Sequence, residues 1–227
     1  NWVVMLLKGF ESDEVRAVAG SYDIANPKSL LAQCIHEEIK YRHVKFGKYI
    51  NAFGSYNVAI RRDVLEETEG FNESYRTSSG EDNDLSYKIV KAGYRILFKE
   101  DAIVAHHHTE KLWKYLKEQY RHGYWRMKLY KDFPDMTKGD DYMTLKDIVE
   151  PNLSLLAFCS FPFVWHKYGI FFFLTFLLSN AIIQFPMPYR IIKRKRRFKF
   201  IYLAWVTFLR AHSRGLGMFM GIVKFWL

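Results

Sequence analysis

The sequence predicts an α/β domain followed by apolar helices, and three observations support this prediction. Apolar runs typical of strands alternate with segments of helical periodicity along residues 1–150, an order found in α/β layer architectures. The composition then changes, because residues 153–227 lack acidic side chains. Residues 169–187 are uncharged over nearly the ~20 residues that a spanning helix needs. We therefore divide the chain into domains 1–150 and 151–227.

The overall composition excludes several classes of protein. The 227 residues carry a formal net charge of +10, and 49 % of them are hydrophobic and 18 % aromatic. This is too apolar for a disordered chain and sufficient for a packed core. Cys34 and Cys159 are far apart and show neither metal spacing nor a disulfide framework, which favours a reducing compartment.

The first elements follow from periodicity and turn residues. Residues 2–10 place apolar side chains at helical spacing, so the chain is expected to begin inside a domain, with further residues upstream and no signal peptide. Residues 15–19 predict a buried strand that ends at a Gly20-Ser21 turn. Asn26 is a candidate cap for the helix that follows.

A second group of elements precedes the apolar region. Residues 57–60 predict a strand, and a short helix is expected from Asp63. A helix over 81–92 should end at Gly93, a residue suited to the position after a helix C-terminus. Two short strands are expected within 94–108, and a long helix should end before Pro134.

The apolar region predicts a membrane tail. Residues 152–165 are consistent with half of a hairpin or with an interfacial helix. The basic cluster 190–199 favours the cytoplasmic side and anionic headgroups, at about 1 kcal/mol per basic side chain. Arg210, His212 and Arg214 interrupt the last apolar stretch, which we expect to lie along the membrane or to re-enter it.

The same residues allow two alternatives to a membrane tail. A pair of buried core helices in a soluble protein would also be apolar. Nucleic-acid binding through the basic cluster is disfavoured, because its flanks resemble membrane segments and no base-reading module is visible.

The acidic stretch Gly80-Glu81-Asp82-Asn83-Asp84 is the first candidate site. Carboxylates at a helix N-terminus are stabilised by unpaired N–H groups, so a purely structural role is one interpretation, with Ser78, Ser79 or Asp82 as the N-cap. The alternative is a general base that deprotonates an acceptor hydroxyl.

The histidines at 106–108 follow an apolar strand. Strand alternation puts His106 and His108 on one face and His107 on the other. One or two of them could bind Mn²⁺ or Mg²⁺ together with carboxylates, whereas a hydrogen-bonded cluster at a strand end is the structural alternative.

Two weaker motifs complete the candidates. Gly54 and Asn57 could let a ligand approach the backbone and Arg62 could meet a phosphate, although ordinary turn chemistry also explains them. Gln119 and Arg121 lie on an aromatic, basic helix that suits sugar or diphosphate contact, or simply covers a sheet.

In their order along the chain, "GSYNVAIRRDVLEETEGFNES", "GEDNDLSYKIVKAGYRI" and "DAIVAHHHTEKLWKYLKEQYRHG" resemble the inverting glycosyltransferases of family two, which have the GT-A fold. The resemblance covers residues 1 to about 135 and the character of the tail. It implies a nucleotide-sugar donor and one-step displacement with inversion. It also implies a membrane-bound enzyme that decorates a lipid-linked or cell-envelope glycan, with its catalytic domain on the cytoplasmic side.

The resemblance assigns roles to individual residues. Asp82 matches the catalytic base of the "ED" motif, Glu81 its partner on the acceptor side, and His106 a histidine that contacts metal or diphosphate. Gly80, Gly54, Asn57, Arg62, Gln119 and Arg121 are then candidates for donor or acceptor binding. The family's "Q-x-x-R-W" helix is matched only at Gln119, which favours transfer of a single sugar over processive synthesis.

The family's metal-binding "D-x-D" is not found in this sequence. The resemblance places these aspartates upstream, so Mn²⁺ or Mg²⁺ binding would require residues outside the chain. Domain 1–150 would then be the acceptor-side part of the catalytic domain, inactive alone, and 151–227 its membrane tail.

Two other functions compete with this one. A non-catalytic membrane-bound scaffold or glycan-binding relative would need a broken "D-x-D" upstream, and the intact Glu81-Asp82 pair argues against it. A metal hydrolase using the histidines with Asp82 and Asp84 would need more ligands at metal spacing than the sequence offers.

Overall fold

The computed structural model describes residues 1–138 and 140–227 and contains two compact units. The sheet unit comprises Asn1–His108 and Asp132–Tyr142, and the helical unit comprises Thr109–Lys131 and Met143–Leu227. The division differs from a boundary at residue 150, because one helix runs through that position and the long helix after residue 111 belongs with the C-terminal helices.

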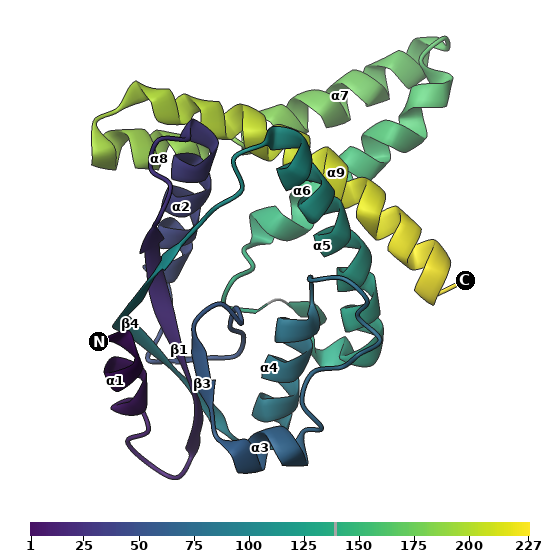
Figure 1. The fold of residues 1–227 in the computed structure, drawn as a ribbon. Helices are drawn as coiled ribbons and strands as arrows, with labels where there is room; N and C mark the ends of the chain where they lie inside the picture. The colour runs from purple at the N-terminus through teal and green to yellow at the C-terminus, as the bar shows by residue number, and fades with distance from the viewer. Residues whose placement is uncertain (139) are drawn as a thin grey trace. The chain divides into compact units, whose positions relative to one another are not determined.

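The sheet unit is built on a mixed sheet of four strands in the order β2-β4-β1-β3 (Figure 1). The strands are β1 Val15–Ile24, β2 Tyr49–Ile50, β3 Val58–Ile60 and β4 Arg95–His106. β1 and β4 are parallel neighbours, whereas β3 pairs antiparallel with β1 and β2 with β4. Its helices are α1 Trp2–Leu7, α2 Leu30–His43, α3 Arg62–Glu67 and α4 Glu81–Lys91, with a 3-10 helix at Pro134–Lys138.

The sheet buries apolar side chains on both faces. One cluster joins Ala17 and Ala19 of β1 to Leu85 and Ile89 of α4. The other joins Val15 and Val18 of β1 to Leu6 of α1, with further members in β4. A strand buried on both faces explains why residues 15–19 form a nearly continuous apolar run.

The two central strands are longer than the sequence predicts. β1 continues through Gly20-Ser21 to Ile24, and β4 is one strand rather than two. The register jumps where Gly20 pairs with Lys99 and Ser21 with Ile103, so β4 bulges between them. The Asn57 side-chain amide donates to the carbonyl oxygens of Ser21 and Ala102, at 2.8 Å each, and ties both strands together across the bulge.

The helix ends also differ from the predicted caps. α2 begins at Leu30, where the Ser29 hydroxyl accepts from the Ala32 N–H at 3.3 Å. Asn26 instead exchanges two hydrogen bonds with the backbone of His108, at 2.8 and 3.0 Å. At the end of α4, Gly93 has a φ of +88°, as the sequence predicts for the residue after a C-terminus.

The helical unit contains five α-helices among the described residues: α5 Leu112–Asp132, α6 Leu145–Ser160, α7 Lys167–Ile183, α8 Pro186–Lys195 and α9 Tyr202–Phe225. α6 and α7 form an antiparallel hairpin joined by a 3-10 helix at Phe161–Phe163 (Figure 1). The hairpin alternative for residues 152–165 is therefore correct. At its open end, the Asn180 amide donates to the Glu150 carbonyl and the Ser154 hydroxyl, at 2.8 and 2.7 Å.

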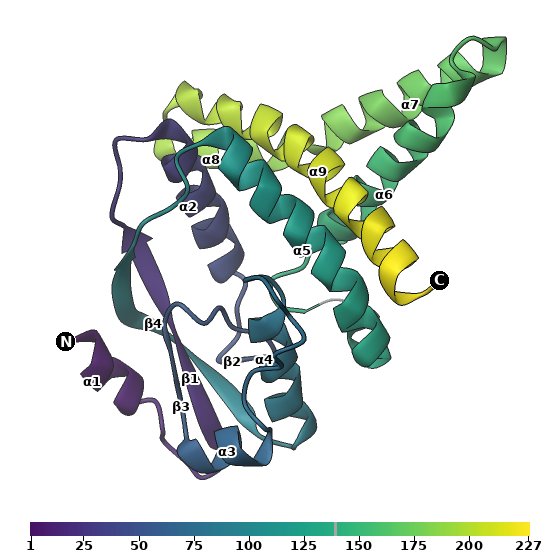
Figure 2. The same cartoon turned by 45° about the vertical axis from the view of Figure 1, so that its right-hand side comes forward.

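Glycines let α9 approach α5 closely, and the two helices run side by side in Figures 1 and 2. A Cβ on Gly217 would collide with the Tyr120 carbonyl, and one on Gly123 with the Arg214 carbonyl. The Ser213 hydroxyl adds a bond of 2.7 Å to the Leu116 carbonyl. Small residues at a helix interface permit this backbone-to-backbone packing.

The arginines that interrupt the last apolar stretch form ion pairs with α6. Arg210 is 1 % exposed and lies 3.2 Å from the carboxylate of Glu150, which is also bonded to Lys146 at 2.7 Å. Arg214 contacts Asp147 at 3.3 Å. These pairs explain the basic interruptions of α9 without invoking a membrane surface.

Replacing Gly20 with alanine should destabilise the sheet unit. The new methyl group would collide with the Asn57 amide and the Ala102 carbonyl, at a cost of about 1–3 kcal/mol. Thermal unfolding of Gly20→Ala should show a lowered midpoint. The matched control is Gly47→Ala, whose methyl group would lie 3.6 Å from the Tyr49 carbonyl, in ordinary contact. Equal unfolding midpoints for the two variants would contradict the close packing of Gly20 against Asn57 at the bulge.

Neutralising Glu150 should destabilise the helical unit. Glu150→Gln removes the charge of the carboxylate that pairs with the buried Arg210, and breaking a buried ion pair costs about 3–5 kcal/mol. Denaturant unfolding of the purified protein measures this loss. The exposed Lys117→Gln serves as control and should change stability by less than about 0.5 kcal/mol.

Candidate functional site

The acidic stretch forms the first turn of α4. Gly80 is the N-cap with a φ of +96°, a left-handed conformation that favours glycine, and no side chain caps the helix. The predicted caps Ser78, Ser79 and Asp82 therefore do not have this role. Glu81 accepts a hydrogen bond of 2.6 Å from the Ser79 N–H, and Asp82 accepts one of 2.9 Å from the Asn83 N–H. The left-handed turn thus presents both carboxylates at the head of the helix.

Asp84 differs from its neighbours, because it is only 1 % exposed. It lies 3.3 Å from the Lys88 ammonium one turn later and accepts a long bond of 3.4 Å from Asn72. These contacts give Asp84 a structural role within α4 and separate it from the half-buried Asp82.

The segment Asp140–Tyr142 packs against α4 and was missed by the sequence analysis. Asp140 accepts hydrogen bonds from the Tyr87 hydroxyl at 2.6 Å and from the Asn83 amide at 3.2 Å. Asp141 and Asn51 are joined by two backbone-to-side-chain bonds. The only signal in the sequence is an acidic pair between two helices, which does not specify a contact 57 residues away.

A cluster of histidine and tyrosine rings lies beside the left-handed turn at Gly80. The Tyr22 ring centroid is 4.3 Å from that of Tyr56 and 5.1 Å from that of His106. The ring centroids of His106 and His108 are 4.9 Å apart, which confirms that the two side chains share a face. We call Tyr22, His43, Tyr56, His106, His108 and Tyr142 the ring cluster.

The parallel strands create this cluster. Ile24 pairs with His106, so β1 and β4 end together and deliver Tyr22 and the histidines to one edge of the sheet. Gly54 lets the Tyr56 ring lie against its backbone, since a Cβ there would collide with that ring. The Tyr142 hydroxyl lies 3.4 Å from His43 Nε2 and links the cluster to the segment that packs on α4.

Burial sets the electrostatics of the ring cluster. It lowers the pKa of His43 to about 4, with a further contribution from Lys40, and it lowers the pKa of His106. Burial also raises the pKa values of Tyr56 and Tyr142, and the nearby Asp82 carboxylate acts in the same direction on both phenols. The cluster is therefore neutral at pH 7, and Asp82 lies close enough to affect the two phenols.

A metal site is not formed by these residues alone. No three His, Cys, Asp or Glu side chains among residues 1–138 and 140–227 are placed to hold a metal ion. His106 has His108 as an aromatic neighbour, but no carboxylate completes a ligand set in the described chain. The residues present do not fit a divalent cation without further ligands.

The other predicted binding residues lie in different places. Asn57 is 2 % exposed and clamps the strand bulge, so its amide is engaged in the fold. Arg62 lies at the opposite end of β3 from the ring cluster, beside a shallow hollow of about 610 Å³ next to α3. Gln119 and Arg121 belong to α5 of the helical unit, where Gln119 accepts a bond of 2.8 Å from Arg214.

A comparison against protein families agrees with the fold. The model for "Glycosyltransferase like family 2" matches residues 1–124, more than half of the chain. The chain therefore belongs to the family-two glycosyltransferases, and residues 1–124 are part of a GT-A domain. A comparison with curated proteins gives no match.

Acidification should destabilise the sheet unit through His43. Its folded pKa of about 4 lies below the unfolded value of about 6.5, so the unfolded state binds more protons between these pH values. The destabilisation of the folded state is small above pH 6.5 and grows as the pH falls towards 4, to on the order of 3 kcal/mol.

Unfolding midpoints measured from pH 7 to pH 4 test this prediction. Because carboxylates titrate in the same range, the informative quantity is the difference between the wild type and His43→Gln. The variant should lose less stability on acidification, whereas parallel curves would show that His43 does not contribute. The exposed His107→Gln is the matched control and should follow the wild type.

Proposed function

We propose that this glycosyltransferase moves one sugar from a nucleoside-diphosphate donor to a lipid-linked or cell-envelope glycan, with inversion and with Asp82 as the general base. The observation that supports this most strongly is the left-handed turn at Gly80, which presents Glu81 and Asp82 beside the ring cluster. Family membership supports glycosyltransfer, and the geometry of the turn supports the choice of base.

The proposed step is a single displacement. The acceptor hydroxyl oxygen forms a bond to the anomeric carbon while the bond from that carbon to the diphosphate oxygen breaks. The acceptor proton passes to the Asp82 carboxylate, and the nucleoside diphosphate leaves with the bonding electrons. Attack opposite the leaving group inverts the anomeric centre.

Glu81 and the ring cluster have supporting roles in this proposal. The bond from Ser79 N–H to Glu81 holds the turn, so that Asp82 keeps its position during proton transfer. The neutral rings of Tyr56 and His106 offer flat surfaces and hydrogen-bonding groups to a sugar near Asp82. Gly80 contributes through its backbone.

Members of this family often use a divalent metal ion. We propose that Mn²⁺ or Mg²⁺ binds with aspartates upstream of this chain and with His106 as one ligand. The ion would offset charge on the diphosphate; every other part of the proposed step rests on residues of this chain.

Membrane attachment is part of the proposal. Residues Lys167–Lys195 are helical, long and apolar enough to cross a bilayer, which weakly indicates membrane association. We propose that the region after residue 150 is a membrane tail and that the catalytic part, acceptor-side residues 1–150, faces the cytoplasm. No nucleic acid is needed as a partner.

Asp82→Asn should lower turnover by at least about 100-fold, since an amide cannot accept the acceptor proton. The assay measures release of nucleoside diphosphate from a panel of nucleotide sugars by membranes that contain the protein encoded by the natural gene. The expected result is donor turnover that requires acceptor and is lost in the variant. Equal turnover in both proteins would remove Asp82 from the mechanism.

The exposed Glu100→Gln is the matched control and should retain turnover, because Glu100 lies in the bulge of β4 and has no part in the proposed step. Absence of turnover with every donor and acceptor would favour the alternative, a non-catalytic glycan-binding or scaffold relative.

A further inference from the structure

The α6–α7 hairpin is an apolar feature of the helical unit. Hydropathy identifies one spanning candidate, Lys167–Lys195, and a single span would leave the segments before and after it on opposite faces of a bilayer. In the structure that stretch is two helices, α7 and α8, which meet at Gln184 and Pro186. Whether this stretch crosses the bilayer once therefore depends on how α7 packs against the other helices.

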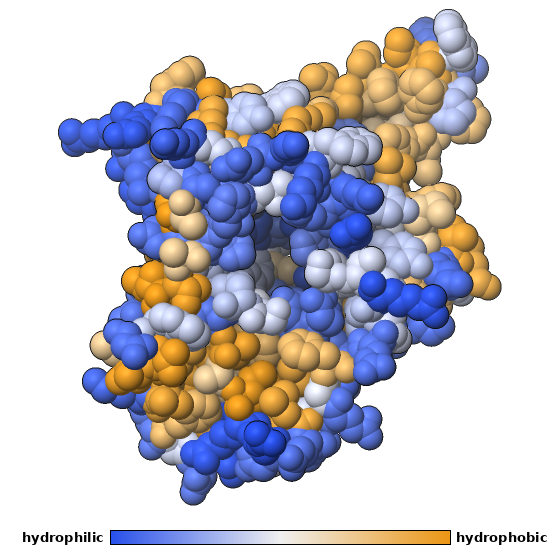
Figure 3. Space-filling model, in the orientation of Figure 1, coloured by the Kyte–Doolittle hydropathy of each residue, from blue (hydrophilic) through white to orange (hydrophobic). Residues whose placement is uncertain are grey.

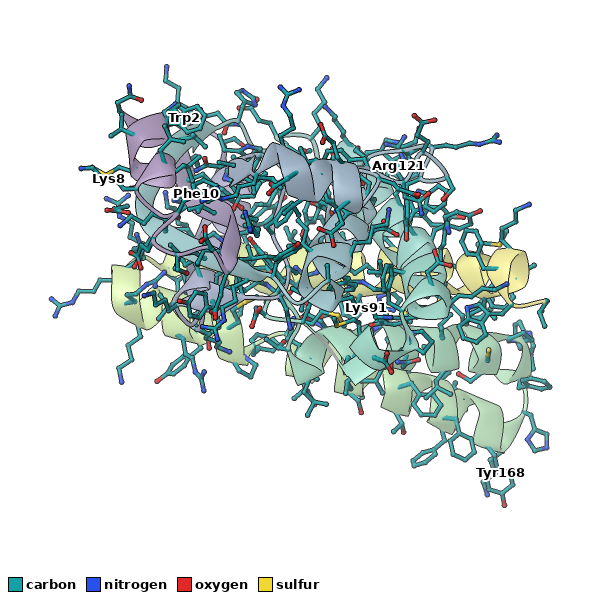
Figure 4. The ribbon with its side chains drawn as sticks, turned by 90° about the horizontal axis from the view of Figure 1, so that it is seen from below. Trp2, Lys8, Phe10, Lys91, Arg121 and Tyr168 are labelled. Atoms are coloured by element: carbon teal, nitrogen blue, oxygen red, sulfur yellow. The ribbon has the colours of Figure 1, made fainter. Side chains whose placement is uncertain are left out.

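The outer surface of the hairpin matches hydrocarbon better than water. Only 17 % of the apolar window is buried, so α7 is not the core helix of a soluble protein. Exposed side chains cover both of its helices: Leu156, Phe158, Phe161, Phe163, Ile170, Phe171, Phe172, Leu174, Leu178 and Ile182. Figure 3 shows this apolar surface on the hairpin, and Figure 4 shows Tyr168 pointing outward at its tip. An apolar surface of this extent on a soluble chain would be an aggregation site.

The open end of the hairpin is polar and is held together by hydrogen bonds. The Asn180 amide bonds to Glu150 and Ser154, and Gln184 donates to Asn180 at 2.9 and 3.1 Å. Glu150 also pairs with Arg210 of α9. The start of α6, the end of α7 and α9 therefore meet at one level, where buried polar groups satisfy one another.

Helices from before and after the hairpin also pack together. α5 precedes it and α9 follows it, yet Gly217 and Gly221 of α9 lie against the backbone of α5. The Trp226 indole donates to the Met127 carbonyl at 3.2 Å, and Lys131 donates to the Phe225 carbonyl at 2.5 Å. A bilayer between α5 and α9 would break every one of these contacts.

Charge then distinguishes the two ends of the hairpin. The basic residues that follow α7 lie at its open end, and exposed members include Lys193, Arg196 and Arg197. Anionic headgroups attract such a cluster, at about 1 kcal/mol for each basic side chain. The tip carries exposed Trp165 and Tyr168 together with His166 and one lysine, Lys167.

We propose that α6 and α7 insert into the lipid bilayer as one helical hairpin and return the chain to the face it entered, where the basic cluster 190–199 contacts anionic headgroups. α5 and α9 stay together on that face. The anchor is thus a two-helix insertion rather than a single span, and this proposal does not depend on the identity of the sugar substrates.

Sidedness is tested with single cysteines at exposed positions before and after the hairpin, Lys117→Cys on α5 and Arg197→Cys after α8, in a Cys159→Ala background. Cys34 is fully buried and can remain. A membrane-impermeant maleimide is added to intact bacterial cells expressing each variant and to sealed inverted vesicles. Both positions should react in the same preparation; reaction in opposite preparations would establish a single span and overturn the proposal.

Insertion is tested at the native Cys159, which is exposed near the tip of the hairpin. A bimane fluorophore on Cys159 of the purified protein in vesicles should be quenched by lipids carrying nitroxides on their acyl chains and should lose quenching by aqueous iodide. The reverse pattern would show that the hairpin lies outside the bilayer and would also overturn the proposal.

The headgroup contact is tested by replacing Lys193, Arg196 and Arg197 with glutamine. Partitioning of the protein onto vesicles containing anionic lipid should fall by on the order of 100-fold at low salt, with no change on neutral vesicles. The matched control replaces three exposed lysines of the sheet unit, Lys8, Lys28 and Lys40, and should leave partitioning unchanged. Equal losses in both variants would reduce the effect to net charge and contradict the assigned surface.

Discussion

The parallel pairing of β1 and β4 is the constraint on which the candidate site depends. This pairing brings Tyr22 and His106 to the same edge of the sheet, although they are far apart in the sequence. The pairing is irregular, because β4 carries extra residues opposite Gly20 and Ser21. Asn57 holds that irregularity with two hydrogen bonds, and the absence of a side chain at Gly20 makes room for it.

A second constraint positions the proposed base. The head of α4 is held from outside the helix by Asp140, which bonds to Tyr87 and Asn83, while Tyr142 of the same segment contacts His43 of α2. One short segment thus connects the helix that carries Asp82 to the rings that surround the site. Asp82, half-buried at the head of α4, is the acid beside these rings that we propose as the general base.

The helical unit depends on a different interaction, the pairing of buried charges. Arg210 and Arg214 of α9 pair with Glu150 and Asp147, so α6 compensates the charges that interrupt this apolar helix. Glycines then bring α5 and α9 into contact, while the apolar hairpin projects from this polar base. The amino-acid composition of α9 resembles an interfacial helix, but its arginines are explained by partners that are far away in sequence.

The sequence by itself determined the class of fold, most helices, the Gly93 stop and the grouping of His106 with His108, because these depend on local periodicity and on single-residue backbone preferences. It also identified the acidic turn and the family. Tertiary structure decided the rest: the clamp role of Asn57, the remote position of Arg62, the packing of Asp140 on α4 and the pairing of Arg210 with Glu150. Each of these depends on contacts between residues distant in sequence, and a chain pattern that repeats every two or four residues carries no information about them.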